Sequence, residues 1–140
     1  MNTSSHDGDS SEKAEKEAKA VAVGVDLIEH ERLIETYQRF GERFLRRVFT
    51  DREIAEAEGR ITRLMGRFVA KEATAKALGT GIGAVAWREI EVVRMPGGKP
   101  ELRLHGAAAA LAAKQGWIAF DLSISDTHRH TIAMVVALRG

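Results

Sequence analysis

The pattern of apolar and polar positions predicts a strand followed by two helices at the start of the folded chain. A β-branched apolar run at residues 20–25 predicts a buried strand that ends at Asp26. Apolar positions then recur at helical spacing over residues 29–40, where Gly41 ends the helix, and a second helical segment covers residues 44–49. An acidic residue at the end of a buried strand is a common place for a functional site.

The central part of the sequence predicts two further helices. Residues 50–53 form a capping box, which places the start of a helix at Asp51 and a break near Gly59. A longer helix is predicted over residues 60–78, with Gly79 in the position of a C-cap glycine. This long helix is the natural centre of the fold.

Beyond residue 83 the apolar spacing changes towards two, which is typical of strands. The remaining predicted elements are a strand, a turn, a strand, an Ala-rich helix and two further strands, at residues 87–95, 96–99, 101–104, 106–114, 117–125 and 131–138. The sequence therefore predicts a single α+β domain over residues 20–140, with antiparallel strands packed against the long helix.

Composition narrows the class of protein. Residues 1–19 contain almost no apolar side chain other than alanine and are expected to form a disordered or frayed N-terminal extension. The formal net charge of +1 argues against a protein that binds nucleic acid or a membrane surface. No apolar run is long enough for a membrane helix and no export signal is visible, so we expect a cytoplasmic protein. The absence of cysteine excludes disulfides, thiolate zinc sites and a cysteine nucleophile.

Two acidic residues stand out as candidates for chemistry. At helical spacing Glu72 lies on the apolar face of the long helix, where a carboxylate is costly unless it is paired or holds a cation. Lys76, four residues on, offers one partner, and the pair would then be a buried structural ion pair. Asp26 offers the other interpretation, because two carboxylates suit Mg²⁺ and substrate phosphates. Both interpretations stay open at this level.

Basic residues raise similar alternatives. Arg67 and Lys71 are spaced to share another face of the long helix, either as a solvated surface or as a polyphosphate contact. The glycine-rich run at residues 79–83 follows a helix instead of preceding one, so it is not expected to cradle an anion on a helix dipole. Arginines also gather between residues 32 and 47, as a solvated face or as a surface for an acidic protein.

Several segments together resemble the holo-acyl-carrier-protein synthases, the short 4′-phosphopantetheinyl transferases. The resemblance extends from Val21 to Leu138 and is most specific in the segment around Lys71 and Glu72. The matching segments are Gly24-Val25-Asp26, GRFVAKEATAKALGTG at residues 66–81, WREIEV at residues 87–92, Gly98-Lys99-Pro100 and Leu122-Ser123-Ile124-Ser125.

The resemblance implies an enzyme of fatty acid biosynthesis that transfers 4′-phosphopantetheine from coenzyme A to a serine of apo acyl carrier protein. Adenosine 3′,5′-bisphosphate is the second product. By the family pattern Asp26 and Glu72 match the Mg²⁺ ligands and Lys76 matches the lysine beside the coenzyme A phosphates. With these roles, Glu72 is expected to take the serine proton, either directly or through a water. The coenzyme A contacts so implied are Arg67, Lys71, Lys76, Gly79 and Gly81, and for Arg67 and Lys71 the alternative is that they only brace the site.

The resemblance also implies partners. Arg32, Arg43 and Arg47 fall where the family's basic helix meets the acidic carrier protein. Members of this length form homotrimers with active sites at subunit interfaces, and we expect the same here. One departure is Asp126, where many relatives have histidine, and it affects any coenzyme A contact from that turn.

Two other functions share some of these sequence features. A non-catalytic module that binds the carrier protein would keep the arginines and would not need Asp26 for binding. A metal-dependent nuclease also uses paired carboxylates, but the near-zero net charge and the lack of a basic groove in the sequence disfavour it.

Overall fold

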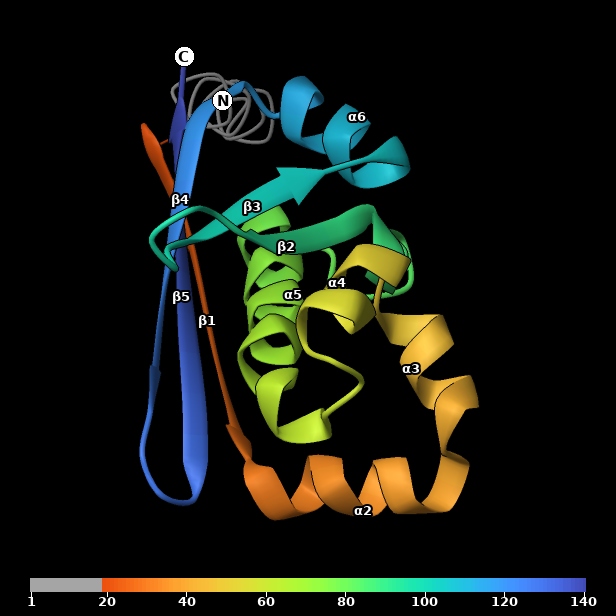
Figure 1. Ribbon diagram of the computed structural model, residues 1–140. Helices are drawn as coiled ribbons and strands as arrows, with labels where there is room; N and C mark the ends of the chain where they lie inside the picture. Colours follow the sequence, from red (N-terminus) through yellow and green to blue (C-terminus); the bar gives the residue numbers. More distant parts are fainter. Residues whose placement is uncertain (1–18) are drawn as a thin grey trace, which may run out of the picture.

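The computed structural model describes residues 19–140 and shows two antiparallel sheets packed against one long helix: the larger sheet runs beside the helix, and the smaller sheet crosses its upper part (Figure 1). The predicted extension, residues 1–19, lies outside this part of the chain except for Lys19. The elements are, in order, β1 (Val21–Glu29), α2 (His30–Phe40), α3 (Glu42–Val48), α4 (Asp51–Glu56), the 3-10 turn η1 (Ile61–Arg63), α5 (Met65–Leu78), the 3-10 turn η2 (Trp87–Glu89), β2 (Ile90–Arg94), β3 (Pro100–Leu104), α6 (Gly106–Lys114), β4 (Trp117–Asp126) and β5 (His130–Arg139). The predicted α+β class is confirmed.

The larger sheet joins the first strand to the last two. Its strand order is β1-β5-β4 and all pairings are antiparallel. β1 does not end at Asp26 as the sequence predicted, because β5 supplies partners as far as the pair Glu29 and His130. The strand is also not buried on both faces. In a single chain only one face of this sheet packs against α5, so alternate residues of β1 point to solvent.

The long helix α5 is shorter than predicted at its start. Residues 61–63 form a 3-10 turn and the helix begins at Met65, because the backbone of Arg60 is extended and Leu64 turns into a small core beside α3. The predicted end is confirmed, since Gly79 has φ 81° and its amide closes the last turn. One face of α5 carries buried residues against the larger sheet and fixes the main core of the domain.

A second small core lies under α3 and α4, to one side of α5 in Figure 1. Phe49 is fully buried there, and Phe68 of α5 stacks on Trp87 with 5.0 Å between ring centroids. The predicted capping box is present: the Thr50 hydroxyl accepts from the Glu53 amide, and the Glu53 carboxylate accepts from the Thr50 amide. This core holds the α2–α4 layer against the long helix.

The smaller sheet is the predicted hairpin, with one correction. The segment from Trp87 to Glu89 is a 3-10 turn and not part of the strand, because the Glu89 carboxylate accepts a hydrogen bond of 2.7 Å from the Ala86 amide and closes the turn. β2 then begins at Ile90 and packs against α5. Across residues 19–140, no helix has both the length and the apolar character needed to cross a membrane.

Candidate active site

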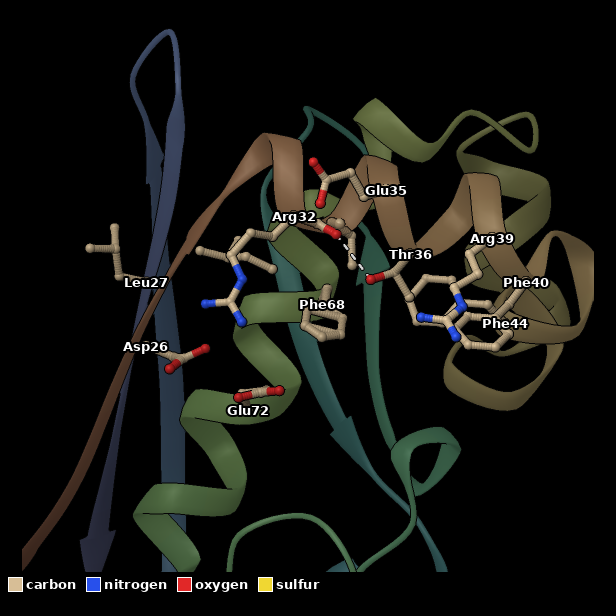
Figure 2. A pocket seen from close by; sticks show the side chains of 12 residues that line it. Asp26, Leu27, Arg32, Glu35, Thr36, Arg39, Phe40, Phe44, Phe68 and Glu72 are labelled. Carbon is tan, nitrogen blue, oxygen red and sulfur yellow. Dashed lines mark hydrogen bonds between the residues drawn. The ribbon is translucent and has the colours of Figure 1, made fainter.

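Asp26 and Glu72 meet where β1 passes α5. Asp26 comes from the middle of β1 and Glu72 from the second turn of α5, and Figure 2 shows their carboxylates turned towards each other. Neither side chain lies in the dry core, and the Asp26 side chain is 15% exposed. The structure thus brings together the two acids that the sequence proposed as partners.

Lys76 completes this group but pairs with a different acid from the one that its spacing suggested. Its Nζ donates to Oδ1 of Asp26 over 2.8 Å and to the carbonyl oxygen of Val25 over 3.3 Å. The alternative of a buried Glu72–Lys76 ion pair is therefore wrong: the Lys76 side chain is 53% exposed and leans across to β1. The hydrogen bond and the charge of Asp26 raise the pKa of Lys76 above its ordinary value.

The electrostatics of Glu72 follow from this crowding. Burial raises the pKa of Glu72 above its usual range, and the nearby Asp26 carboxylate raises it further, while Lys76 partly opposes the shift. A carboxyl group held in this way gains from a cation beside it and also accepts a proton more readily than an ordinary glutamate. Both properties are typical of a site for metal or acid–base chemistry.

The two acids open into a cavity between β1, α2 and α5. The cavity has a volume of about 690 Å³, within the range of small-molecule sites. Figure 2 shows the guanidinium of Arg32 projecting over it towards the carboxylates. The cavity lining consists of Asp26, Leu27, Ile28, Arg32, Leu33, Glu35, Thr36, Arg39, Phe40, Phe44, Phe68 and Glu72.

A second, more apolar cavity of about 420 Å³ continues this face of the molecule. Arg43 and Arg47 line it, and it shares Thr36, Phe40, Phe44 and Phe68 with the first cavity. The three arginines proposed for the carrier protein thus border two adjoining cavities. We call this surface the arginine face.

The sequence grouped Arg39 with the other arginines between residues 32 and 47, but the resemblance did not place it among the carrier-protein contacts. Arg39 lines the first cavity, and its guanidinium lies 5.2 Å from the ring centroid of Phe40. The signal was available, because Arg39 lies seven residues after Arg32 and therefore on the same face of a helix.

Lys71 occupies a different environment from the one expected. Its side chain is 0% exposed, and Nζ donates to Oε1 of Glu53 over 2.7 Å and to the carbonyl oxygens of Trp87 and Ile90. Burial lowers the pKa of Lys71, and the Glu53 charge opposes this. The expectations of a solvated surface and of a coenzyme A contact are therefore corrected, because all three ammonium donors are already used inside the protein.

Arg67 likewise braces the fold. Its guanidinium donates to Oε1 of Glu56 over 2.8 Å and to the carbonyl oxygens of Val92 and Arg63, both over 3.1 Å. The Arg67 side chain is 13% exposed and forms part of the wall of a separate cavity of about 520 Å³ that also includes Asp126. Only a small part of Arg67 is therefore accessible to a ligand.

The glycines after α5 form the exit loop that the sequence predicted. Gly79 and Gly81 both have positive φ, 81° and 66°, and they lie three and five residues after Lys76 in the sequence. No group of three or more His, Cys, Asp or Glu side chains able to hold a metal occurs within residues 19–140. Asp26 and Glu72 thus form a pair of oxygen donors and not a complete metal cage.

Comparison with known proteins gives the class. The chain matches the 4′-phosphopantetheinyl transferase superfamily over residues 22–134, and it belongs to that family. It is 41% identical over 120 residues to the holo-[acyl-carrier-protein] synthase of Koribacter versatilis (strain Ellin345). The matched region covers 83% of this chain and 96% of that protein.

Solved structures agree in fold. The crystal structure of holo-[acyl-carrier-protein] synthase from Neisseria meningitidis has a TM-score of 0.77 and 37% identity, covering 84% of this chain and 98% of that one. The Helicobacter pylori holo-[acyl-carrier-protein] synthase, solved in complex with coenzyme A, has a TM-score of 0.74 and 28% identity, covering 82% of this chain and 98% of that one. The family resemblance seen in the sequence is therefore confirmed.

Proposed function

We propose that this chain is a holo-acyl-carrier-protein synthase. It transfers 4′-phosphopantetheine from coenzyme A to a serine hydroxyl of apo acyl carrier protein and releases adenosine 3′,5′-bisphosphate. The observation that carries the proposal is the pair of carboxylates of Asp26 and Glu72 in the lining of a cavity that opens onto the arginine face, with the Lys76 ammonium 2.8 Å from Asp26. The chain matches 96% of the Koribacter versatilis protein, which is named for this activity, and 98% of the Helicobacter pylori synthase, whose structure was solved in complex with coenzyme A.

The residues present fit Mg²⁺. Asp26 and Glu72 offer hard carboxylate oxygens, and Mg²⁺ usually takes one or two of these with water and substrate phosphates. The crowding of the two carboxylates raises the pKa of Glu72, and the Lys76 ammonium already lies against Asp26, so this place in the fold favours positive charge. Asp26 and Glu72 would hold the ion, which would neutralise charge on the coenzyme A pyrophosphate.

The chemistry assigns a role to each side chain. The serine oxygen attacks the β-phosphorus of coenzyme A, and the bond from that phosphorus to the bridging oxygen breaks. Glu72 takes the serine proton, a role that suits a carboxylate of raised proton affinity. Lys76 stabilises the charge on the departing phosphate, because its half-exposed ammonium can turn from Asp26 to the leaving group.

Coenzyme A is bound beside these residues. We propose Lys76, Gly79 and Gly81 as its contacts at the end of α5, with Arg67 limited to the wall that it already forms. Lys71 is not included, because its ammonium is buried and paired.

The carrier protein docks on the arginine face. Arg32, Arg43 and Arg47 surround Phe40 and Phe44, so the surface offers positive charge around an apolar floor. An acidic helix with a few apolar side chains is the complementary partner. Docking there would bring the acceptor serine to the cavity that holds Asp26 and Glu72.

We further propose that the chain forms a homotrimer. The outer face of the larger sheet exposes a contiguous set of large apolar side chains: Val21, Val23, Val25, Leu27, Ile132, Met134 and Leu138. Directly paired residues of β1 and β5 contribute them, so they form one patch, and such patches mark interfaces. Asp26 lies between Val25 and Leu27 in the sequence and on the opposite face of β1, so the proposed interface and the site share this strand.

The assembly has its own test. Val23→Glu is expected to give monomers by light scattering after gel filtration and to lower transfer activity strongly. Ala110→Glu, at an exposed position of α6, is the control and is expected to leave the trimer intact. A wild-type protein that is monomeric at assay concentrations would contradict the trimer.

Since the reaction uses coenzyme A and serves fatty acid synthesis, we propose that the protein works in the cytoplasm.

Intact-mass spectrometry tests the activity itself. Apo acyl carrier protein incubated with this protein, coenzyme A and Mg²⁺ is expected to gain the mass of one phosphopantetheine. Glu72→Ala and a chelator are each expected to abolish the gain. Carrier binding without any mass gain would instead favour a non-catalytic carrier-binding module.

A further inference from the structure

Gly24 of β1 lies against the backbone of α5 with no room for a side chain. A Cβ placed on Gly24 would be 1.9 Å from the carbonyl oxygen of Ala73 and 2.7 Å from the amide nitrogen of Ala77. Both neighbours are main-chain atoms, so no rotamer change relieves the overlap. A side chain at this position would have to move the strand and the helix apart.

This close contact lies directly beside the site. Ala73 follows Glu72 in the sequence and Ala77 follows Lys76, while Gly24 precedes Asp26 by two residues on the same face of β1. The chain segments that touch at Gly24 are therefore the ones that carry the three site residues. The 2.8 Å bond from Lys76 to Asp26 is formed across this same contact.

The helix side of the contact is built from small residues as well. Ala70, Ala73 and Ala77 follow one another at helical spacing and are buried in the main core. The absence of larger side chains on both elements sets how closely β1 approaches α5. It thereby sets how far the Asp26 carboxylate lies from Glu72.

We propose that Gly24 is a positioning residue that fixes the separation between the Asp26 and Glu72 carboxylates. This inference rests on the proposed function, in which both carboxylates hold one cation. Gly24 touches neither metal nor substrate and acts through Asp26. Displacements of the order of 1 Å in such groups change rates by about a hundredfold.

Compensation by side-chain length tests the inference. Gly24→Ala is expected to widen the gap, and Asp26→Glu lengthens the side chain that must span it. Each single variant is expected to weaken Mn²⁺ binding about tenfold or more, whereas the double variant recovers most of the affinity. Mn²⁺ binding is measured by electron paramagnetic resonance on the full chain with coenzyme A present and no carrier protein.

A merely structural role predicts a different pattern. Ala22→Val adds volume on the same face of β1, farther from Asp26, where Ala22 is buried. It is expected to lower Tm by an amount similar to Gly24→Ala and to leave Mn²⁺ affinity within about threefold. Equal losses of Mn²⁺ affinity in these two variants, or no recovery in the double variant, would overturn the positioning role.

Two further results complete the test. Ala77→Ser adds one side-chain atom to the buried residue whose amide nitrogen lies opposite Gly24 and is expected to weaken Mn²⁺ binding less than Gly24→Ala, so the test survives if the alanine variant does not fold. Normal Mn²⁺ affinity in folded Gly24→Ala or in Ala77→Ser would overturn the inference. Absence of Mn²⁺ binding and of transfer activity in the wild type would overturn the proposed function itself.

Discussion

The helix α5 carries two clusters of lysine and carboxylate that differ in almost every physical respect. Lys71 and Glu53 are fully buried, and the Glu53 carboxylate also accepts from the amides of Thr50 and Val92. Asp26 and Glu72 border an open cavity, where the two carboxylates are crowded together and the half-exposed Lys76 pairs with Asp26. The buried cluster has its hydrogen-bonding groups paired within the protein, whereas the open cluster has capacity for a ligand.

The two clusters show how charged side chains that stabilise the fold differ from those that can bind a ligand on the same helix. A charged pair whose partners are all internal stabilises one arrangement of α4, α5 and β2 and has nothing left to offer a substrate. Two carboxylates held close together next to solvent repel each other, and binding of a cation or a proton stabilises them.

The largest difference between the two clusters is expected when Glu72 is neutralised. Glu72→Gln keeps the size of the side chain and is expected to lower kcat about 10²- to 10⁴-fold, because it removes the proposed base. The Tm is expected to stay close to that of the wild type, since the side chain is only partly buried. Steady-state transfer assays and thermal melts measure the two effects. A kcat within about tenfold of wild type would show that Glu72 is not the base.

Replacing Lys71 is expected to affect stability instead of catalysis. Lys71→Met leaves the buried Glu53 carboxylate without its partner and is expected to lower the free energy of unfolding by about 3–5 kcal/mol. Adding Glu53→Gln, which can still form the capping box, is expected to recover part of this loss. Lys76→Met is the matched control and is expected to change the unfolding free energy by no more than about 1 kcal/mol while lowering kcat. Urea denaturation gives these values, and similar losses for both lysines would refute the distinction.

The arginine face extends the comparison to a partner. Arg43→Ala combined with Arg47→Ala is expected to raise KM for the carrier protein on the order of tenfold at low salt, with little change in kcat, because charges at the rim steer association. Arg46→Ala provides the control, since Arg46 pairs with Glu42 on the same helix and lines neither cavity of the arginine face. An equal rise in KM for the control would place docking elsewhere.

The smallest expected effect is the pH dependence of stability without metal. Because folding raises the pKa of Glu72, the stabilisation from this group is full below the ordinary glutamate pKa and is lost as the pH rises through the folded value. Asp26→Asn removes part of the cause, so its stability is expected to fall less over the same pH interval, by less than about 1 kcal/mol. Urea midpoints in a chelator from pH 4 to 8 measure the two slopes. Identical slopes would contradict the crowding of the carboxylates.

Much of the fold was predictable because its signals are local. The capping box at Thr50 and the glycine that ends α5 both act within a few residues, and both are present as expected. The end of β1 was not predictable in this way. Its continuation past Asp26 depends on β5, which lies about a hundred residues farther along the chain.

The site shows the same limit of local reasoning. Spacing on a helix suggested that Lys76 pairs with Glu72, but a neighbouring strand supplied Asp26 as the partner. Spacing also grouped Lys71 with Arg67 on one surface, whereas Glu53 and the carbonyl oxygen of Ile90 take Lys71 into the interior. The types of residue were readable from the sequence, and their partners were decided by tertiary contacts.

The pairing of β1 with β5 has a consequence for how this protein is made. Asp26 belongs to a strand whose neighbour, His130–Arg139, is synthesised about a hundred residues later. The helices α2 to α5 can form while translation continues, but β1 has no partner in the larger sheet until β5 leaves the ribosome. Such long-range closure is slow compared with helix formation. Catalytic competence is therefore expected to appear late and abruptly, only once β5 is free to pair with β1.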